Sequence, residues 1–488
     1  MKSRQNKIMT MPESLLPHPA SFRDPSGFVF RRNGLYYRQV NRCYAADYDR
    51  LMGSGLYQAL TAKGWLIRHE EVNVDVGSHS GVGGNEWYRT LLPQQIGRIS
   101  YAGEWGPDQL RDAALLTLNI LGTAIGHGMI LKDASPSNVQ FVDGNAVFID
   151  SLSFEQYDET SPWVAYRQFC ECFLFPLYLQ HYLKTGIGKI LGAWPEGIPA
   201  AVTAKLLPWK SRLNAGVWLH VMMQSKIRRD IAQGGKRGTG RGPHLSFSKK
   251  KLEHLVDHLK NITGGLGLNE RSSSAWSDYY DKSILSEAYL AAKEKLFLEF
   301  TAAVQYASAL DLGANNGHFS RLLARHKATI VAVDSDWQCI NELYLGEKKR
   351  RGSILPLCID LSNPTPAAGF RNAERSSFTD RMQADLVAAL ALVHHLVLGK
   401  NIPLEGVARY FADLAWKHLI VEFVPIADEK AQELIRNKSR WHIPYDAESF
   451  EHAFGDYFGI VRKEFIPGTE RILYLMTKKD ARSLGENK

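Results

Sequence analysis

The sequence predicts an α/β protein: a doubly wound, mostly parallel sheet with a terminal antiparallel hairpin in the C-terminal part, and an α+β region before it. Apolar runs of strand length recur in the C-terminal part, and helical segments separate most of them, as in doubly wound sheets. These runs cover residues 307–312, 329–333, 354–359, 385–392 and 418–423. The last two runs, 459–465 and 471–476, have only the turn Pro467-Gly468 between them, which predicts a hairpin.

The N-terminal region is expected to begin with a β-hairpin. Residues 27–32 and 35–40 are strand-like and flank Asn33-Gly34, a dipeptide typical of two-residue hairpin turns. The elements expected after it are helices over about 45–62 and 107–126, short strands over 139–141 and 146–150, and an aromatic-rich helical stretch over 163–183. Helices and short strands together predict an α+β region.

Length and composition restrict the class of protein. A chain of 488 residues is long enough for two or three domains. Hydrophobic residues at 45% and charged residues at 23% exclude a disordered or fibrous chain. The five cysteines are too scattered for a disulfide framework, which favours a cytoplasmic protein. Residues 1–14 lack the apolar core of a signal peptide, and the polar residues and glycines in 113–131 favour a buried helix over a transmembrane one.

The net charge of +8 comes mostly from one segment, residues 226–260. Because residues 233–243 are rich in glycine, we expect a solvated basic linker there, followed by a short amphipathic helix over 249–262. Nucleic acid or anionic lipid is the alternative partner of this segment. The expected domain boundaries are 1–230, 231–275 and 276–478, followed by a polar tail over 479–488.

A glycine-containing loop follows the first C-terminal strand. The strand ends at Asp311, the loop carries Gly313, Asn315 and Gly317, and a helix begins near Phe319. The glycines let the backbone turn sharply and approach a ligand closely. A dinucleotide site would have Gly-x-Gly-x-x-Gly, whereas this loop reads Asp-x-Gly-x-x-x-Gly. The leading acid can hold an ammonium group, as in an amino-acid moiety.

Two further acids end the next two strands. Asp334 ends the run after the glycine loop, where a carboxylate can accept hydrogen bonds from ribose hydroxyls. Asp360-Leu361 follows the third run, placed to meet an adenine amino group. Because open α/β sheets bind ligands at the carboxyl ends of their strands, these residues predict a nucleoside site.

Residues 276–478 resemble a class I S-adenosylmethionine-dependent methyltransferase, whose sheet is Rossmann-like. Asp311, Gly313 and Gly317 match its first motif, Asp334 its ribose-binding acid and Asp360 its adenine-side acid. The terminal hairpin is similar to the family's reversed seventh strand. The stretches 389–395 and 419–425 resemble the NoeA-type nodulation-protein branch. The resemblance implies methyl transfer from S-adenosylmethionine to a small-molecule, glycan or lipid-linked acceptor.

The resemblance also places the acceptor beside the fourth and fifth strands. His394 and His395 follow the fourth strand, and either could be the base for a hydroxyl acceptor. Glu422, near the end of the fifth strand, could contact the acceptor. The alternatives are capping or packing for the histidines and a structural ion pair for Glu422. A nucleic-acid methyltransferase is the less favoured alternative, because an Asn/Asp-Pro-Pro-aromatic motif is absent after the fourth strand.

A second motif lies in the N-terminal region. Asp133 and Asn138 frame four residues, and Phe148-Ile-Asp150 follows. This pattern resembles the catalytic loop and metal-binding acid of the protein-kinase-like superfamily. The resemblance implies that Asp133 accepts a hydroxyl proton and that Asn138 and Asp150 hold Mg²⁺ against ATP phosphates.

The N-terminal sequence also departs from the kinase-like pattern. Leu131-Lys132 replaces the usual His-Arg, Ser151-Leu152 follows Asp150, and the Gly-rich loop is absent. Arg38 is a poor substitute for the phosphate-binding lysine. A bifunctional kinase and methyltransferase, a degenerate domain that binds without turnover, and an unrelated α/β domain therefore remain open.

Overall fold

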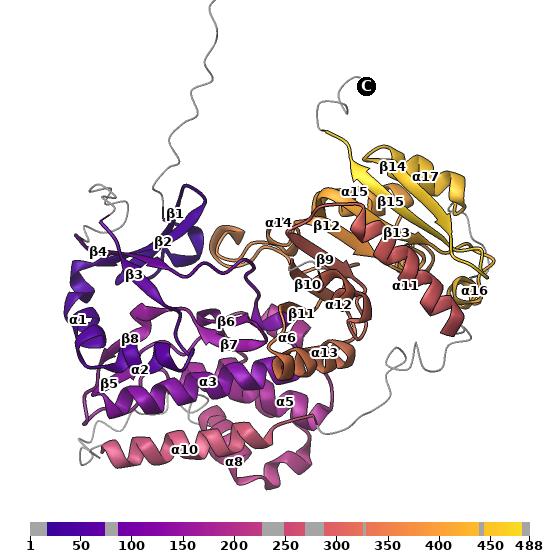
Figure 1. The fold of residues 1–488 in the computed structure, drawn as a ribbon. Helices are drawn as coiled ribbons and strands as arrows, with labels where there is room; N and C mark the ends of the chain where they lie inside the picture. Colours follow the sequence, from indigo (N-terminus) through magenta and orange to yellow (C-terminus); the bar gives the residue numbers. More distant parts are fainter. Residues whose placement is uncertain are drawn as a thin grey trace, which may run out of the picture.

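The computed structural model describes two halves that pack against each other (Figure 1). The described residues are 17–73, 86–226, 248–268, 287–325, 328–438 and 444–480. We refer to residues 17–268 as the N-terminal half and to residues 287–480 as the C-terminal half. The glycine-rich stretch 233–243 and most of the predicted tail lie outside the described residues, whereas the amphipathic helix of the predicted linker is α10 (Lys249–Gly265).

The C-terminal half contains a seven-stranded sheet in the order β11-β10-β9-β12-β13-β15-β14. Its strands are β9 (Ser308–Leu312), β10 (Thr329–Asp334), β11 (Ile354–Cys358), β12 (Ala384–Ala389), β13 (Ala415–Phe423), β14 (Phe458–Phe465) and β15 (Ile472–Lys478). The first five are parallel, while β15 runs antiparallel to both β13 and β14. The predicted α/β class and terminal hairpin are therefore confirmed. One predicted strand, 385–392, is shorter, because β12 ends at Ala389 and Ala391 has a positive φ of 49°.

Helices cover both faces of this sheet (Figure 1). They are α11 (Glu287–Ala302), α12 (His318–Ala324), α13 (Trp337–Arg350), α14 (Phe378–Arg381), α15 (Leu404–Leu414), α16 (Glu429–Ile435) and α17 (Ala447–Gly455). Alternate residues of a strand point to opposite faces, so Ala309 and Ile330 join one hydrophobic cluster, and Leu310 and Val331 join another. The second cluster continues into the N-terminal half, and the two halves therefore share a core.

The N-terminal half has a four-stranded antiparallel sheet and a mainly helical part. The sheet has the order β1-β2-β4-β3 and contains β1 (Gly27–Arg32), β2 (Leu35–Asn41), β3 (His69–Glu71) and β4 (Trp87–Pro93). The two-stranded pairs are β5 (Met129–Leu131) with β8 (Phe154–Gln156) and β6 (Val139–Val142) with β7 (Asn145–Phe148). The hairpin at Asn33-Gly34 is confirmed, as is the α+β content.

The N-terminal helices follow the prediction with one correction. Helix α3 (Pro107–Gly126) has the predicted ends. The helix predicted over 45–62 is wrong as a single element: it is α1 (Ala45–Gly53) and α2 (Leu56–Ala62), separated where Gly55 adopts a left-handed φ of 81°. The remaining helices are α4 (Tyr166–Phe169), α5 (Phe175–Leu183), α6 (Gly188–Ala193), α7 (Ala200–Leu206) and α8 (Ala215–Val217), with a π-helical turn over Cys170–Leu174. Among the helices in the described ranges, none is long and apolar enough to cross a membrane.

The halves meet along α3 and α13, which lie side by side in Figure 1. The Asn341 side chain accepts a hydrogen bond from the Asp108 backbone N–H at 2.8 Å and donates one to the Asp108 carboxylate at 2.7 Å. Arg381 forms an ion pair with Glu104, and the Glu104 side chain is fully buried. Buried polar groups therefore link the two halves directly, and the α13 side of the C-terminal half packs against the N-terminal half.

Candidate functional site

The loop between β9 and α12 is held against β10. Backbone N–H groups of Gly313 and Ala314 both donate to the Val333 carbonyl oxygen at 2.9 Å. Gly313 and Gly317 have φ angles of 76° and 77°. A Cβ atom at Gly317 would lie 2.5 Å from the nearest Leu343 side-chain atom, so a side chain there would meet α13. Both glycines are therefore required by the local backbone, as the sequence predicts.

Asp311 lies at the end of β9 beneath this loop. Its side chain is buried, and one carboxylate oxygen accepts a hydrogen bond from the Ser320 hydroxyl at 2.6 Å. Burial raises the pKa of Asp311 to about 6, although the Ser320 bond acts in the opposite direction. The positive charge of Lys293 also favours the ionised form. A carboxylate in these surroundings is stabilised by an added cation, such as an ammonium group.

Asp334 ends the neighbouring strand β10 and faces the same loop. Its carboxylate accepts the backbone N–H groups of Asn315 and Asp336, each at 2.9 Å. Burial raises the pKa of Asp334, and these two hydrogen bonds oppose that effect. Asn315 has a positive φ of 49°, which turns its N–H toward Asp334. The structure thus brings together Asp311, Gly313, Asn315, Gly317 and Asp334.

Asp360 and Leu361 follow β11, the next strand across the sheet. The Lys189 ammonium group from α6 contacts Asp360 Oδ2 at 2.8 Å, and the Ser362 hydroxyl donates to Oδ1 at 2.6 Å. Burial would raise the pKa of Asp360, but the bonds from Lys189 and Ser362 outweigh it and hold the pKa below its usual value. Leu361 is buried. The three acids therefore lie at the ends of three adjacent strands, with one already paired to the N-terminal half.

The histidine pair follows β12, beside the glycine loop. His394 is fully buried, and neither ring nitrogen has a hydrogen-bond partner among the described residues. The His395 ring lies 4.2 Å away between centroids. Burial lowers the pKa of His394 well below its usual value; burial and the charge of Arg471 lower the pKa of His395 to about 4. Both imidazoles are therefore neutral at pH 7.

Glu422 lies within a buried charge network rather than on an open surface. Its oxygens contact Lys293 Nζ at 2.6 Å and Arg471 Nη1 at 3.3 Å, and the Tyr289 hydroxyl donates to it at 2.9 Å. Arg471 also pairs with Asp428 at 2.8 Å. The Glu422 side chain is fully buried, so the ion-pair alternative fits it better than acceptor contact. Sequence reasoning missed Lys293, whose only signal is a lysine on the apolar face of a helix.

The kinase-like motif residues gather in the N-terminal half. The pKa of Asp133 lies above its usual value. Burial and the charge of nearby Asp150 raise it, while hydrogen bonds from Ser135 and Asn138 act in the opposite direction. Asn138 donates to the Ser153 hydroxyl at 3.1 Å, and that hydroxyl donates to Asp150 at 2.7 Å.

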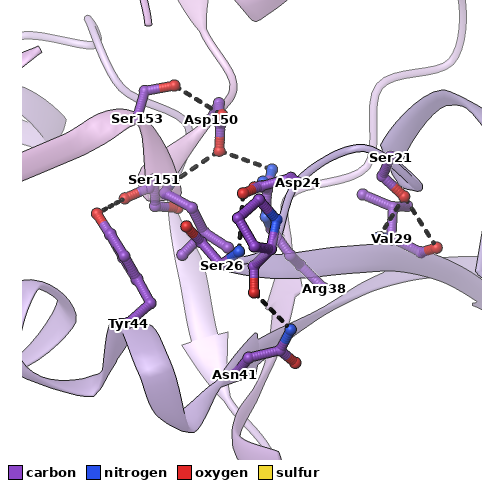
Figure 2. Close-up of polar contacts among 12 residues, drawn as sticks. Ser21, Asp24, Ser26, Val29, Arg38, Asn41, Tyr44, Asp150, Ser151 and Ser153 are labelled. Atoms are coloured by element: carbon purple, nitrogen blue, oxygen red, sulfur yellow. Dashed lines mark hydrogen bonds and ion pairs between the residues drawn. The ribbon is translucent and has the colours of Figure 1, made fainter. Parts of the chain in front are cut away.

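The Arg38 guanidinium group already forms ion pairs within this cluster. Figure 2 shows Arg38 between Asp24 and Asp150, at 3.1 and 2.7 Å respectively. The described part of the chain has no group of three or more His, Cys, Asp or Glu residues that could hold a metal ion. The predicted Mg²⁺ ligands Asn138 and Asp150 are close together, but the charge of the Asp150 carboxylate is neutralised by Arg38.

Comparison with curated proteins finds a relative of similar length. No family model matches the sequence. The chain is 28% identical to the nodulation protein NoeA of Rhizobium meliloti (strain 1021) over 464 residues, covering 94% of this chain and 96% of that protein. This similarity spans both halves.

Solved structures align with less than half of the chain. The N-methyltransferase NodS from Bradyrhizobium japonicum WM9 is 14% identical, with 40% of this chain and 99% of that chain covered and a TM-score of 0.30. The magnesium protoporphyrin IX methyltransferase ChlM from Synechocystis PCC 6803 is 15% identical, with 40% and 88% covered and a TM-score of 0.29. The bifunctional kinase-methyltransferase WbdD is 17% identical, with 41% of each chain covered and a TM-score of 0.29.

Proposed function

We propose that this protein is an S-adenosylmethionine-dependent methyltransferase. The observation that carries the proposal is the pair of buried carboxylates, Asp311 and Asp334, on either side of the loop that bears Gly313 and Gly317. A carboxylate for an ammonium group and one for ribose hydroxyls, at the carboxyl ends of adjacent parallel strands, suit this cofactor. The similarity to NoeA over almost the whole chain is consistent with the resemblance on which the proposal draws.

Each residue of the predicted site has a role in this proposal. Asp311 holds the ammonium group, while Gly313, Asn315 and Gly317 form the backbone wall beside the amino-acid part. Asp334 accepts hydrogen bonds from the ribose, and Asp360 and Leu361 contact the adenine. When bound, the cofactor supplies an electrophilic methyl group. The chain orients the two reactants for in-line attack and excludes water.

On the acceptor side, we propose that the histidine pair after β12 supplies the proton acceptor for a hydroxyl acceptor, through His394 or His395. Burial keeps both imidazoles neutral, the form that can take a proton, and His395 is the less buried of the two. Glu422 acts indirectly, by fixing Lys293 and Arg471. The acceptor is a small molecule, a glycan or a lipid-linked compound, in preference to nucleic acid.

Phosphotransfer in the N-terminal half remains a second hypothesis. The proximity of Asp133, Asn138 and Asp150 favours it, because these are the residue types that hold Mg²⁺ and accept a hydroxyl proton. For Mg²⁺ to bind Asp150, however, Arg38 has to leave that carboxylate. ATP consumption that requires Mg²⁺ and is lost in Asp133→Ala would support a bifunctional enzyme.

Thermal unfolding in the presence of S-adenosylmethionine tests the main proposal. Ligand at 100 times its Kd stabilises the folded protein by about 2.7 kcal/mol, so the unfolding temperature should rise. The Asp133→Ala variant should show the same rise, because Asp133 is not among the residues assigned to S-adenosylmethionine. Stabilisation by NADH with no response to S-adenosylmethionine would contradict the proposal.

Affinity for S-adenosylmethionine should increase between pH 5 and pH 7. Burial raises the pKa of Asp311 to about 6, and only the ionised carboxylate attracts the ammonium group. At pH 5 about one tenth of the carboxyl groups are ionised, so calorimetry should give a Kd about tenfold higher than at pH 7. Ser320→Ala removes a hydrogen bond to the carboxylate and should move the midpoint to higher pH. A Kd that is constant over this range would assign the ammonium group to another partner.

A further inference from the structure

A cavity of about 280 Å³ lies where the N-terminal half meets the carboxyl end of β11. Both halves contribute to its wall. The residues that matter here are Tyr101, Lys189 and Trp194 from the N-terminal half and Asp360, Asn363 and Arg375 from the C-terminal half. The cavity thus opens beside the acid that the proposed function assigns to the adenine.

The N-terminal half fixes this acid directly. Lys189 approaches Asp360 Oδ2 at 2.8 Å, and Ser362 holds the other oxygen. A carboxylate has about four lone-pair sites. Ser362 fills two on Oδ1 through its hydroxyl and its backbone N–H, and Lys189 fills one on Oδ2, which leaves one site on Oδ2 for an adenine amino group. The contact from Lys189 therefore favours the ionised form of the Asp360 carboxylate and fixes its orientation toward the adenine.

The same half holds the segments on either side of Asp360. A Cβ atom at Gly186 would lie 2.8 Å from Trp337 Cγ, so the chain before α6 packs closely on the first residue of α13. The loop after β11 is held by Tyr101, whose hydroxyl accepts the Ser376 N–H at 3.0 Å. Arg375 donates to the Pro195 carbonyl oxygen at 2.8 Å.

We propose that α6 and the chain beside it form part of the cofactor site, with Lys189 as a positioning residue that holds Asp360 for the adenine amino group. This inference rests on the proposed function and extends it, since it makes the N-terminal half a component of the methyltransferase site. Occupation of the cavity by the adenine links cofactor binding to the packing of the two halves.

Calorimetry with S-adenosylhomocysteine tests the role of Lys189. The Lys189 side chain is 77% exposed, so solvent screens the ion pair and Lys189→Ala should weaken binding only about two- to fivefold. Lys189→Glu places a like charge beside Asp360 and should weaken binding at least tenfold. Lys189→Arg should retain most of the affinity. The control is Lys205→Ala, on the exposed side of α7, which should bind like the wild type.

A second probe separates positioning from a general structural effect. S-inosylhomocysteine carries an oxygen in place of the adenine amino group and cannot donate to Asp360 from that position. The wild type should prefer S-adenosylhomocysteine. Lys189→Ala should reduce this preference, measured as the Kd of S-inosylhomocysteine divided by the Kd of S-adenosylhomocysteine. A change in stability alone would alter both Kd values equally and leave the ratio unchanged.

The outcomes distinguish the inference from the proposed function. If the wild type binds S-adenosylhomocysteine and the Lys189→Ala and Lys189→Glu variants bind it equally well, the inference is wrong and the proposed function stands. An unchanged preference between the two probes in Lys189→Ala would also overturn it. If the wild type binds neither probe, the proposed function fails and the inference fails with it.

Discussion

Asp334→Ala is expected to weaken S-adenosylmethionine binding about 100-fold or more. In the proposed site this carboxylate accepts hydrogen bonds from both ribose hydroxyls, and hydrogen bonds to a charged group contribute about 1.5–3 kcal/mol each. Losing two of them corresponds to at least about 3 kcal/mol, or roughly two powers of ten in Kd. The loss is amplified because Asp334 also fixes the loop through the N–H groups of Asn315 and Asp336.

The measurement is a calorimetric titration of the full chain. Glu342→Gln is the matched control, since it removes one negative charge from an exposed position on α13, the helix that follows β10. Unfolding without ligand separates lost binding from lost folding. A folded Asp334→Ala protein with wild-type affinity would show that the cofactor does not use the end of β10.

The places of the three acids in the fold could be predicted because each lies at the end of a strand-like run. Asp311, Asp334 and Asp360 end apolar segments, and parallel strands bring their carboxyl ends to one edge of a sheet. The glycines were informative for the same reason, since a strand that ends in Asp-x-Gly requires a sharp turn. Local sequence was sufficient here because the geometry of the sheet supplies the long-range part.

Contacts between distant segments could not be predicted. Lys189 lies in a short helix with no distinguishing pattern, and its pairing with Asp360 depends on how the two halves pack. The sequence pattern relates Arg38 only to the position of a phosphate-binding lysine, whereas its guanidinium group pairs with Asp24 and Asp150. The break at Gly55 had a local signal, the glycine itself, but a glycine within a helical pattern does not by itself end a helix.

The shared core changes how the domain boundaries are understood. The sequence predicts domains separated by a linker, and a flexible connection would leave each with its own core. Instead, one hydrophobic cluster extends from α3 to the sheet of the C-terminal half, and Asp108–Asn341 and Glu104–Arg381 contacts cross the interface. Cofactor binding is therefore best measured on the whole chain, because the C-terminal half alone would expose this surface to water.

Glu422→Gln is expected to destabilise the protein by about 3–5 kcal/mol, the usual cost of removing one partner from a buried ion pair. Glu422 is the carboxylate paired with Lys293, whose side chain is only 4% exposed. Burial alone would raise the pKa of Glu422, but the charges of Lys293 and Arg471 outweigh it and hold the pKa below its usual value. A group with a lowered pKa stabilises the fold above its unfolded pKa, so the difference from the wild type should shrink as the pH falls below about 4.

Denaturant unfolding of variants tests whether the unpaired Lys293 ammonium group causes the loss of stability in Glu422→Gln. Arg471 retains Asp428, whereas no other carboxylate in the described part of the chain forms an ion pair with Lys293. Adding Lys293→Met to Glu422→Gln should therefore recover much of the stability. Glu405→Gln, at an exposed position on α15, is the control and should change stability by less than about 0.5 kcal/mol. Wild-type stability in Glu422→Gln, together with a loss of methyl transfer, would instead indicate that Glu422 contacts the acceptor. An ion-pair role predicts a loss of stability and an acceptor contact predicts a loss of methyl transfer, so this comparison decides whether Glu422 contributes to the fold or to the chemistry.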